Sequence, residues 1–177
     1  MYRFVLGASL SLASLLAVAV APAYAADPIP HRIIFAVDAC DSTTFNAAVG
    51  PGACVGRSGV PFNVFVKQVE TLHQAPAWRF APGIVVATTT DPIQVQNIGG
   101  EVHTFTEVAK FGGGFVPLLN QLGGFGPMVP ECGEPPNPDN HFLSPGEAFT
   151  FTEANPGTHL YQCCIHPWMH AALTIRP

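Results

Sequence analysis

Turn-forming residues divide most of this chain into short segments, and this limits the folds that it can adopt. The 177 residues include 17 glycines and 18 prolines, and both residue types disfavour long helices. Runs of β-branched and aromatic residues lie between the turns, at 84–86, 93–96, 101–108, 148–152, 158–163 and 171–175. Short strands with a turn every 8–12 residues or so are typical of a β-sandwich. The pattern therefore predicts an all-β fold.

One segment, residues 61–73, predicts a helix instead. Proline is tolerated in the first turn of a helix, and Pro61 stands at that position. Apolar side chains follow at helical spacing: Phe62, Phe65, Val66, Val69 and Leu72. We therefore expect an N-terminal extension over residues 26–77 that contains this one short helix, followed by a β-sandwich domain over residues 78–177.

The first 25 residues have the pattern of a signal peptide. A short positive start at Arg3 precedes a stretch of small apolar residues, and an Ala-x-Ala sequence ends at Ala25. A membrane anchor is the alternative, but serines interrupt the apolar stretch and Pro22 ends it. We expect cleavage after Ala25 and a periplasmic or secreted product without a stable membrane anchor.

The charge of the chain excludes one class of partner. It has 7 lysines and arginines against 12 acidic residues, a net charge of −5. Nucleic-acid binding needs clustered positive side chains along the phosphate backbone. We therefore expect no nucleic-acid partner.

The most informative motif is near the C-terminus, where Cys163, His166 and Met169 follow a predicted strand. A thiolate, an imidazole and a weakly bound thioether suit copper in a trigonal site that also needs a second imidazole. His103 is the best candidate for that second imidazole, because it lies on an alternating strand just after the Gly99-Gly100 turn. Considered separately, His103 could be a buried core histidine and Met169 could simply fill the core.

At this point the chain resembles the cupredoxins, the blue-copper family. The loop Cys163-x-x-His166-Pro167-x-Met169 is most similar to that of the amicyanin branch, and the sequence around His103 is similar to the strand that carries the family's first ligand. The resemblance covers residues 78–177. It implies a Greek-key β-sandwich that holds one mononuclear type 1 copper ion through His103, Cys163, His166 and Met169.

Cys163 and Cys164 are adjacent, so choosing one of them as the metal ligand also decides which cysteines remain to form disulfides. Cys163 leaves the two-residue gap to His166 that the family's loop has, so Cys163 is preferred over Cys164 as the ligand. Export favours disulfides, and an odd count of 5 cysteines leaves one thiol unpaired. Of three possible pairings of the others, we prefer Cys40 with Cys54 and Cys132 with Cys164. A Cys163–Cys164 disulfide is the rival arrangement and would abolish the site.

Neighbouring residues carry weaker predictions. His170 is an alternative fourth ligand, although it lies one residue beyond the family position. By resemblance, the His166 edge is the electron port, with Pro167 and Trp168 beside it as a docking surface; Trp168 could also serve only in packing. Glu101 and Glu107 flank His103 and are expected to be solvated. The glycine- and proline-rich segment 111–140 is expected to be a long loop.

The resemblance implies a function in single-electron transfer between redox protein partners, by a monomer without enzymatic activity. The chain has a single Cys-His-Met loop and no second histidine cluster, which argues against the copper enzymes of the wider superfamily. Copper storage or delivery on the same fold is the main alternative. A metal-free sandwich that binds a protein partner is a third hypothesis.

Overall fold

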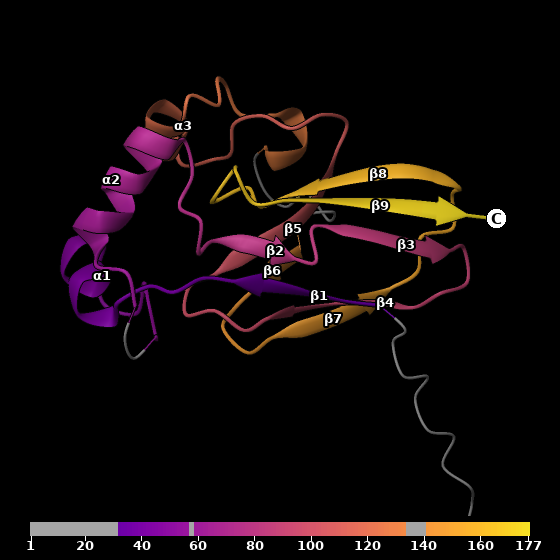
Figure 1. The fold of residues 1–177 in the computed structure, drawn as a ribbon, viewed down its shortest axis with the longest axis horizontal. Coiled ribbons are helices and arrows are strands. Elements are labelled where there is room, and N and C mark those ends of the chain that lie inside the picture. The colour runs from indigo at the N-terminus through magenta and orange to yellow at the C-terminus, as the bar shows by residue number, and fades with distance from the viewer. Residues whose placement is uncertain (1–31, 57–58, 134–140) are drawn as a thin grey trace, which may run out of the picture.

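The computed structural model describes residues 32–56, 59–133 and 141–177. The predicted signal peptide therefore lies outside the described residues. Nine strands and three α-helices follow one another along this part of the chain (Figure 1). The strands are β1 (Arg32–Val37), β2 (Arg79–Ala81), β3 (Ile84–Thr88), β4 (Ile93–Asn97), β5 (His103–Val108), β6 (His141–Leu143), β7 (Ala148–Phe151), β8 (Gly157–Gln162) and β9 (His170–Arg176). The helices are α1 (Ser42–Ala48), α2 (Phe62–Leu72) and α3 (Pro117–Gly123), with a 3-10 turn, η1, at Pro130–Cys132.

The strands form two sheets that enclose one main core. One sheet has the order β2-β1-β4-β7 and the other has the order β3-β9-β8-β5-β6. The chain passes between the sheets five times, from β2 to β3, β3 to β4, β4 to β5, β6 to β7 and β7 to β8, as in a Greek key. The predicted fold class, a β-sandwich with a short helix, is confirmed.

Local sequence patterns located some elements and missed others. Each predicted strand is present within two residues of its expected position, and the helix expected at 61–73 is α2. The patterns missed β1, β2, β6, α1 and α3. The segment 111–140 is not one continuous loop, because α3 and η1 lie within it.

Strand β1 belongs to the predicted N-terminal extension but lies inside the sandwich. It pairs in parallel with β4 and antiparallel with β2. Its Ile34 and Ala36 are fully buried in the main core. A division after residue 77 would therefore separate β1 from both of its partner strands.

The helices gather at one end of the sandwich, the end at which β8 connects to β9 (Figure 1). Phe45 of α1 and Phe65 of α2 both contact the buried ring of Trp78, with centroid distances of 5.8 and 4.6 Å. The Cys40–Cys54 disulfide links the chain on either side of α1. Aromatic packing and one covalent bond thus hold this end together.

No helix in the described part of the chain is both long and apolar enough to cross a membrane.

Phe45 tests the aromatic packing between the helices and the sandwich. It is 1% exposed and its ring contacts Phe62, Phe65 and Trp78. We expect Phe45→Ala to lower the free energy of unfolding by about 3–5 kcal/mol, because it removes these contacts and leaves a cavity. The measurement is urea unfolding, with Val49→Ala as the control, since Val49 is 64% exposed. Equal unfolding midpoints for the two variants would contradict the packing described here.

Candidate metal centre

Three possible metal-donor atoms, from Cys163, His103 and His166, lie close together inside the sandwich, at the end where the helices gather. Sγ of Cys163 lies 3.9 Å from Nδ1 of His103 and 3.8 Å from Nδ1 of His166. The residues are 0%, 0% and 3% exposed, respectively. All three donor atoms lie within 4.8 Å of one another. The structure thus brings together the thiol and the two imidazoles that the sequence analysis proposed as ligands.

The spacing of these donors fits a metal ion between them. Nitrogen and sulfur ligands bound to one ion at about 2.0–2.3 Å, roughly 110–130° apart, lie about 3.5–3.9 Å from each other. The two sulfur–nitrogen distances, 3.9 and 3.8 Å, are at the upper end of this range. One thiolate and two imidazoles are also the donor set of a trigonal copper site. The residues present therefore fit copper.

Strand ends and backbone hydrogen bonds position the sulfur. His103 is the first residue of β5, and Cys163 directly follows β8, the strand that pairs with β5. The backbone amides of Thr104 and His166 donate to Sγ of Cys163 at 3.3 and 3.4 Å. Such donors stabilise negative charge on sulfur. The pairing of β5 with β8 therefore places the thiol and sets its surroundings.

Internal bonds also close the loop between β8 and β9. The Cys163 amide donates to the carbonyl of Met169, and the Met169 amide donates to the carbonyl of His166. Met169 is fully buried in the same core cluster as Cys163. This is the loop position from which the sequence analysis proposed Met169 as the axial ligand, and that assignment stays a prediction.

The other four cysteines form two disulfides, the pairs preferred from the sequence. Cys40 joins Cys54, and Cys132 joins Cys164. Cys163 is free and buried. The second disulfide anchors the residue beside the free thiol to η1. It thereby restricts the loop that carries Cys163, His166 and Met169.

Two carboxylates lie on the far side of the imidazoles from Cys163, an arrangement that local sequence patterns did not predict. Nε2 of His103 lies 2.9 Å from Oδ2 of Asp38, and Nε2 of His166 lies 3.7 Å from Oε2 of Glu101. The side chain of Glu101 is only 13% exposed and accepts a hydrogen bond from Nε1 of Trp78. The expectation that Glu101 is solvated was wrong, because Trp78 and His166 enclose it.

Charge interactions within the cluster shift the pKa values of its members. Burial would raise the pKa of the Cys163 thiol, but the adjacent His103 and His166 rings outweigh burial and hold that pKa well below its usual value. Burial would lower the pKa of His103, but Asp38 and Cys163 raise it to about 9. Without a metal, these interactions favour the thiolate form of Cys163.

The carboxylates respond differently to the same surroundings. Burial would raise the pKa of Asp38, yet its hydrogen bonds with His103 and with the amides of Gly100 and Glu101 keep that pKa below the usual value. Burial raises the pKa of Glu101, and the His166 charge and the Trp78 hydrogen bond only partly oppose this effect. Asp38 is thus the carboxylate that the fold stabilises as an anion.

The predicted docking surface does not match the burial of the loop. Pro167 is buried and Trp168 is only 8% exposed. Phe65 of α2 lies over both His166 and Trp168, with ring centroids 6.3 and 5.9 Å away. Pro167 and Trp168 therefore do not form an open patch in this structure, and Phe65 of α2 packs against Trp168.

The other proposed ligand, His170, and the histidine His159 lie outside the three-donor group. The ring of His170 stacks on Phe111 at 3.7 Å and is not part of the three-donor group. His159 pairs with Glu107, whose oxygen is 2.7 Å from Nδ1, so Glu107 is engaged in an ion pair at the surface.

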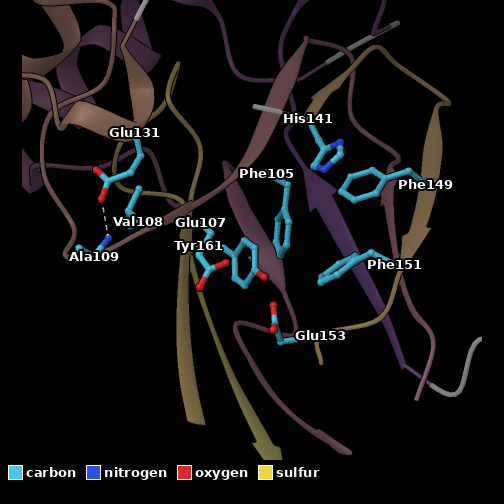
Figure 2. Close-up of a pocket in the computed structure, with 10 residues that line it drawn as sticks. All are labelled: Phe105, Glu107, Val108, Ala109, Glu131, His141, Phe149, Phe151, Glu153 and Tyr161. Carbon is cyan, nitrogen blue, oxygen red and sulfur yellow. Dashed lines mark hydrogen bonds between the residues drawn. The ribbon is translucent and has the colours of Figure 1, made fainter. Parts of the chain in front are cut away.

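A separate cavity of about 550 Å³ has aromatic walls, including Phe105, Phe149, Phe151 and Tyr161 (Figure 2). None of the three converging donors lines it. Its Glu131 accepts a hydrogen bond from the amide of Ala109 (Figure 2). The cavity is therefore distinct from the candidate metal centre.

Comparison with known proteins yields structural similarity alone. No family model and no curated protein matches the sequence. Among solved structures, the chain is similar to a novel purple cupredoxin from Nitrosopumilus maritimus, with 14% identity over 82% of this chain and 99% of that chain and a TM-score of 0.43. It is also similar to a Cu(I) amicyanin mutant, with 14% identity over 55% of this chain and 73% of that one and a TM-score of 0.38. Because these identities and TM-scores are low, the fold is described from its strand order and the site from the positions of its donor atoms.

The low pKa of Cys163 is directly testable in metal-free protein. We expect the ultraviolet absorption of a thiolate to persist well below the usual thiol pKa of about 8.5, because two imidazoles stabilise the anion. The measurement is absorption against pH, with Cys163→Ser as the blank. His103→Ala should move the transition to higher pH. A wild-type transition at the ordinary thiol pKa would contradict the proposed charge pairing.

Proposed function

We propose that this chain is a mononuclear copper protein that transfers single electrons between redox partners. The observation that carries the proposal is the convergence of Sγ of Cys163 with Nδ1 of His103 and Nδ1 of His166 in a buried site. Copper bound there would supply the Cu(I)/Cu(II) couple. Met169, in the same closed loop, is the proposed weak axial ligand.

The chain holds its ligands in one arrangement, which suits repeated electron transfer. His103 is fixed by β5, and Cys163, His166 and Met169 by a loop with its own backbone hydrogen bonds. Two backbone amides fix the sulfur. Ligands that are held by the protein change position little when the charge of the metal changes, so the energetic cost of each electron transfer stays small.

The electron route is proposed to pass through the rings that cover His166. Trp168 lies 5.6 Å from His166, and Phe125 lies 6.2 Å from Trp168, between ring centroids. Phe125 follows α3 and is partly exposed. In this proposal Trp168 conducts the electron from a buried position, and the partner docks beside Phe125.

Export to the periplasm or beyond remains part of the proposal. It is supported by the signal-like residues 1–25 and by the two disulfides, which are typical of proteins in an oxidising compartment. The proposed partners are therefore redox proteins of the same compartment.

The test is the visible absorption spectrum of the oxidised protein after loading with copper. We expect an intense thiolate-to-copper band and a reversible redox couple, because one thiolate would bind the metal directly. Cys163→Ser and His103→Ala should each abolish the band. His141→Ala is the matched control, since His141 is exposed on β6 and should leave the band unchanged.

Two results would overturn electron transfer. A stoichiometric copper adduct without the band or a reversible couple would favour copper delivery. A wild-type protein that binds no copper would leave only the sandwich fold.

A further inference from the structure

Asp38 is a buried carboxylate from the N-terminal segment that contacts the proposed metal centre. We infer that Asp38 is a positioning residue, which orients His103 toward the metal and lowers the reduction potential of the bound copper through its negative charge. This inference rests on the proposed copper function and names a residue that controls it.

The orientation of His103 follows from one hydrogen bond. Oδ2 of Asp38 lies 2.9 Å from Nε2 of His103, and the two side chains are 1% and 0% exposed. A carboxylate accepts but does not donate, so it selects the form of the ring with a proton on Nε2. Nδ1, on the side of the ring that faces Sγ of Cys163, is then the nitrogen that a metal would bind.

Asp38 is itself held by the backbone. Its Oδ1 accepts hydrogen bonds from the amides of Gly100 at 2.9 Å and Cys40 at 3.2 Å. Its Oδ2 accepts one from the amide of Glu101 at 3.0 Å. Three backbone donors thus fix the carboxylate and stabilise its charged form, so the constraint on His103 does not depend on a flexible side chain.

The glycines of the turn before β5 allow this close approach. A Cβ atom at Gly99 would lie 2.0 Å from Oδ2 of Asp38, and one at Gly100 would lie 2.7 Å from Sγ of Cys40. Any side chain at either position would displace the carboxylate or the disulfide. The Gly99-Gly100 pair and the Cys40–Cys54 disulfide therefore both help to hold the Asp38 side chain in its position.

The charge of Asp38 lies in a buried position, since its side chain is only 1% exposed. An anion hydrogen-bonded to a ligand imidazole stabilises Cu(II) more than Cu(I), because it compensates the additional positive charge. The contact between Glu101 and the His166 ring is weaker. Oε2 of Glu101 lies 3.7 Å from Nε2 of His166, and the same Oε2 accepts a hydrogen bond from Nε1 of Trp78. Asp38 is the carboxylate with a direct hydrogen bond to a proposed ligand.

The first experiment uses two variants of the full copper-loaded protein to separate the effect of the Asp38 charge from its effect on the position of His103. Asp38→Asn removes the charge but keeps an oxygen that can accept from Nε2 of His103, whereas Asp38→Ala removes the acceptor as well. We expect Asp38→Asn to weaken Cu(II) binding at least tenfold relative to Cu(I), a rise in potential of about 59 mV or more. Asp41→Asn is the control, because it removes the same charge three residues away, at the N-cap of α1.

The second experiment reads the position of His103 without electron transfer, first in the wild type and then in Asp38→Ala. In ¹⁵N NMR spectra of the diamagnetic Zn(II)-loaded wild type, we expect a proton on Nε2 of His103 that exchanges slowly with water. In Asp38→Ala the same proton should exchange faster, because its acceptor is gone. If Asp38→Ala fails to fold, the wild-type spectrum still shows whether Nε2 of His103 carries a slowly exchanging proton.

Two results would overturn the inference. One is an Asp38→Asn potential equal to those of the wild type and Asp41→Asn. The other is a wild-type His103 that binds zinc through Nε2, or whose Nε2 proton exchanges freely. A colourless copper form with a protected Nε2 proton would instead reject the proposed function while supporting the positioning role of Asp38.

Discussion

The contact of the Cys163 sulfur with two imidazoles is the interaction on which the site and its surroundings depend. A thiolate inside an apolar core is costly unless charge and hydrogen bonds compensate it. His103, His166 and two backbone amides provide that compensation. The register of β5 against β8, the closed loop before β9 and the carboxylates behind the rings all serve to keep these groups in place.

The N-terminal segment, residues 32–77 in the described part of the chain, completes this site in three ways. Strand β1 is an interior strand of one sheet, so the sandwich itself includes the segment. Asp38, at the end of β1, bonds to His103. Phe65 of α2 covers His166 and Trp168. The segment therefore contributes a strand, the carboxylate that contacts His103 and the ring that covers His166, and residues 78–177 alone would lack all three.

Much of this arrangement could be predicted from local patterns, and the rest depends on distant contacts. Alternation and turns located β3, β4, β5, β7, β8 and β9, and helical spacing located α2. The motif near the C-terminus and the strand position of His103 indicated three residues, His103, Cys163 and His166, whose donor atoms lie together in the structure. The role of Asp38 could not be predicted, because it acts on a residue 65 positions away. A signal was present in retrospect: the Gly99-Gly100 pair implies the close approach of another segment. The burial of Trp168 was missed for the same reason, since α2 reaches it only in the folded chain.

The central claim, that Cys163, His103 and His166 bind one copper ion together, is tested most directly by X-ray absorption at the copper edge of the loaded protein. We expect one short copper–sulfur bond and two copper–nitrogen bonds of about 2.0 Å from imidazole. In His103→Ala one imidazole contribution should disappear. A first shell of nitrogen and oxygen without a short sulfur bond, or a shell unchanged in His103→Ala, would contradict it.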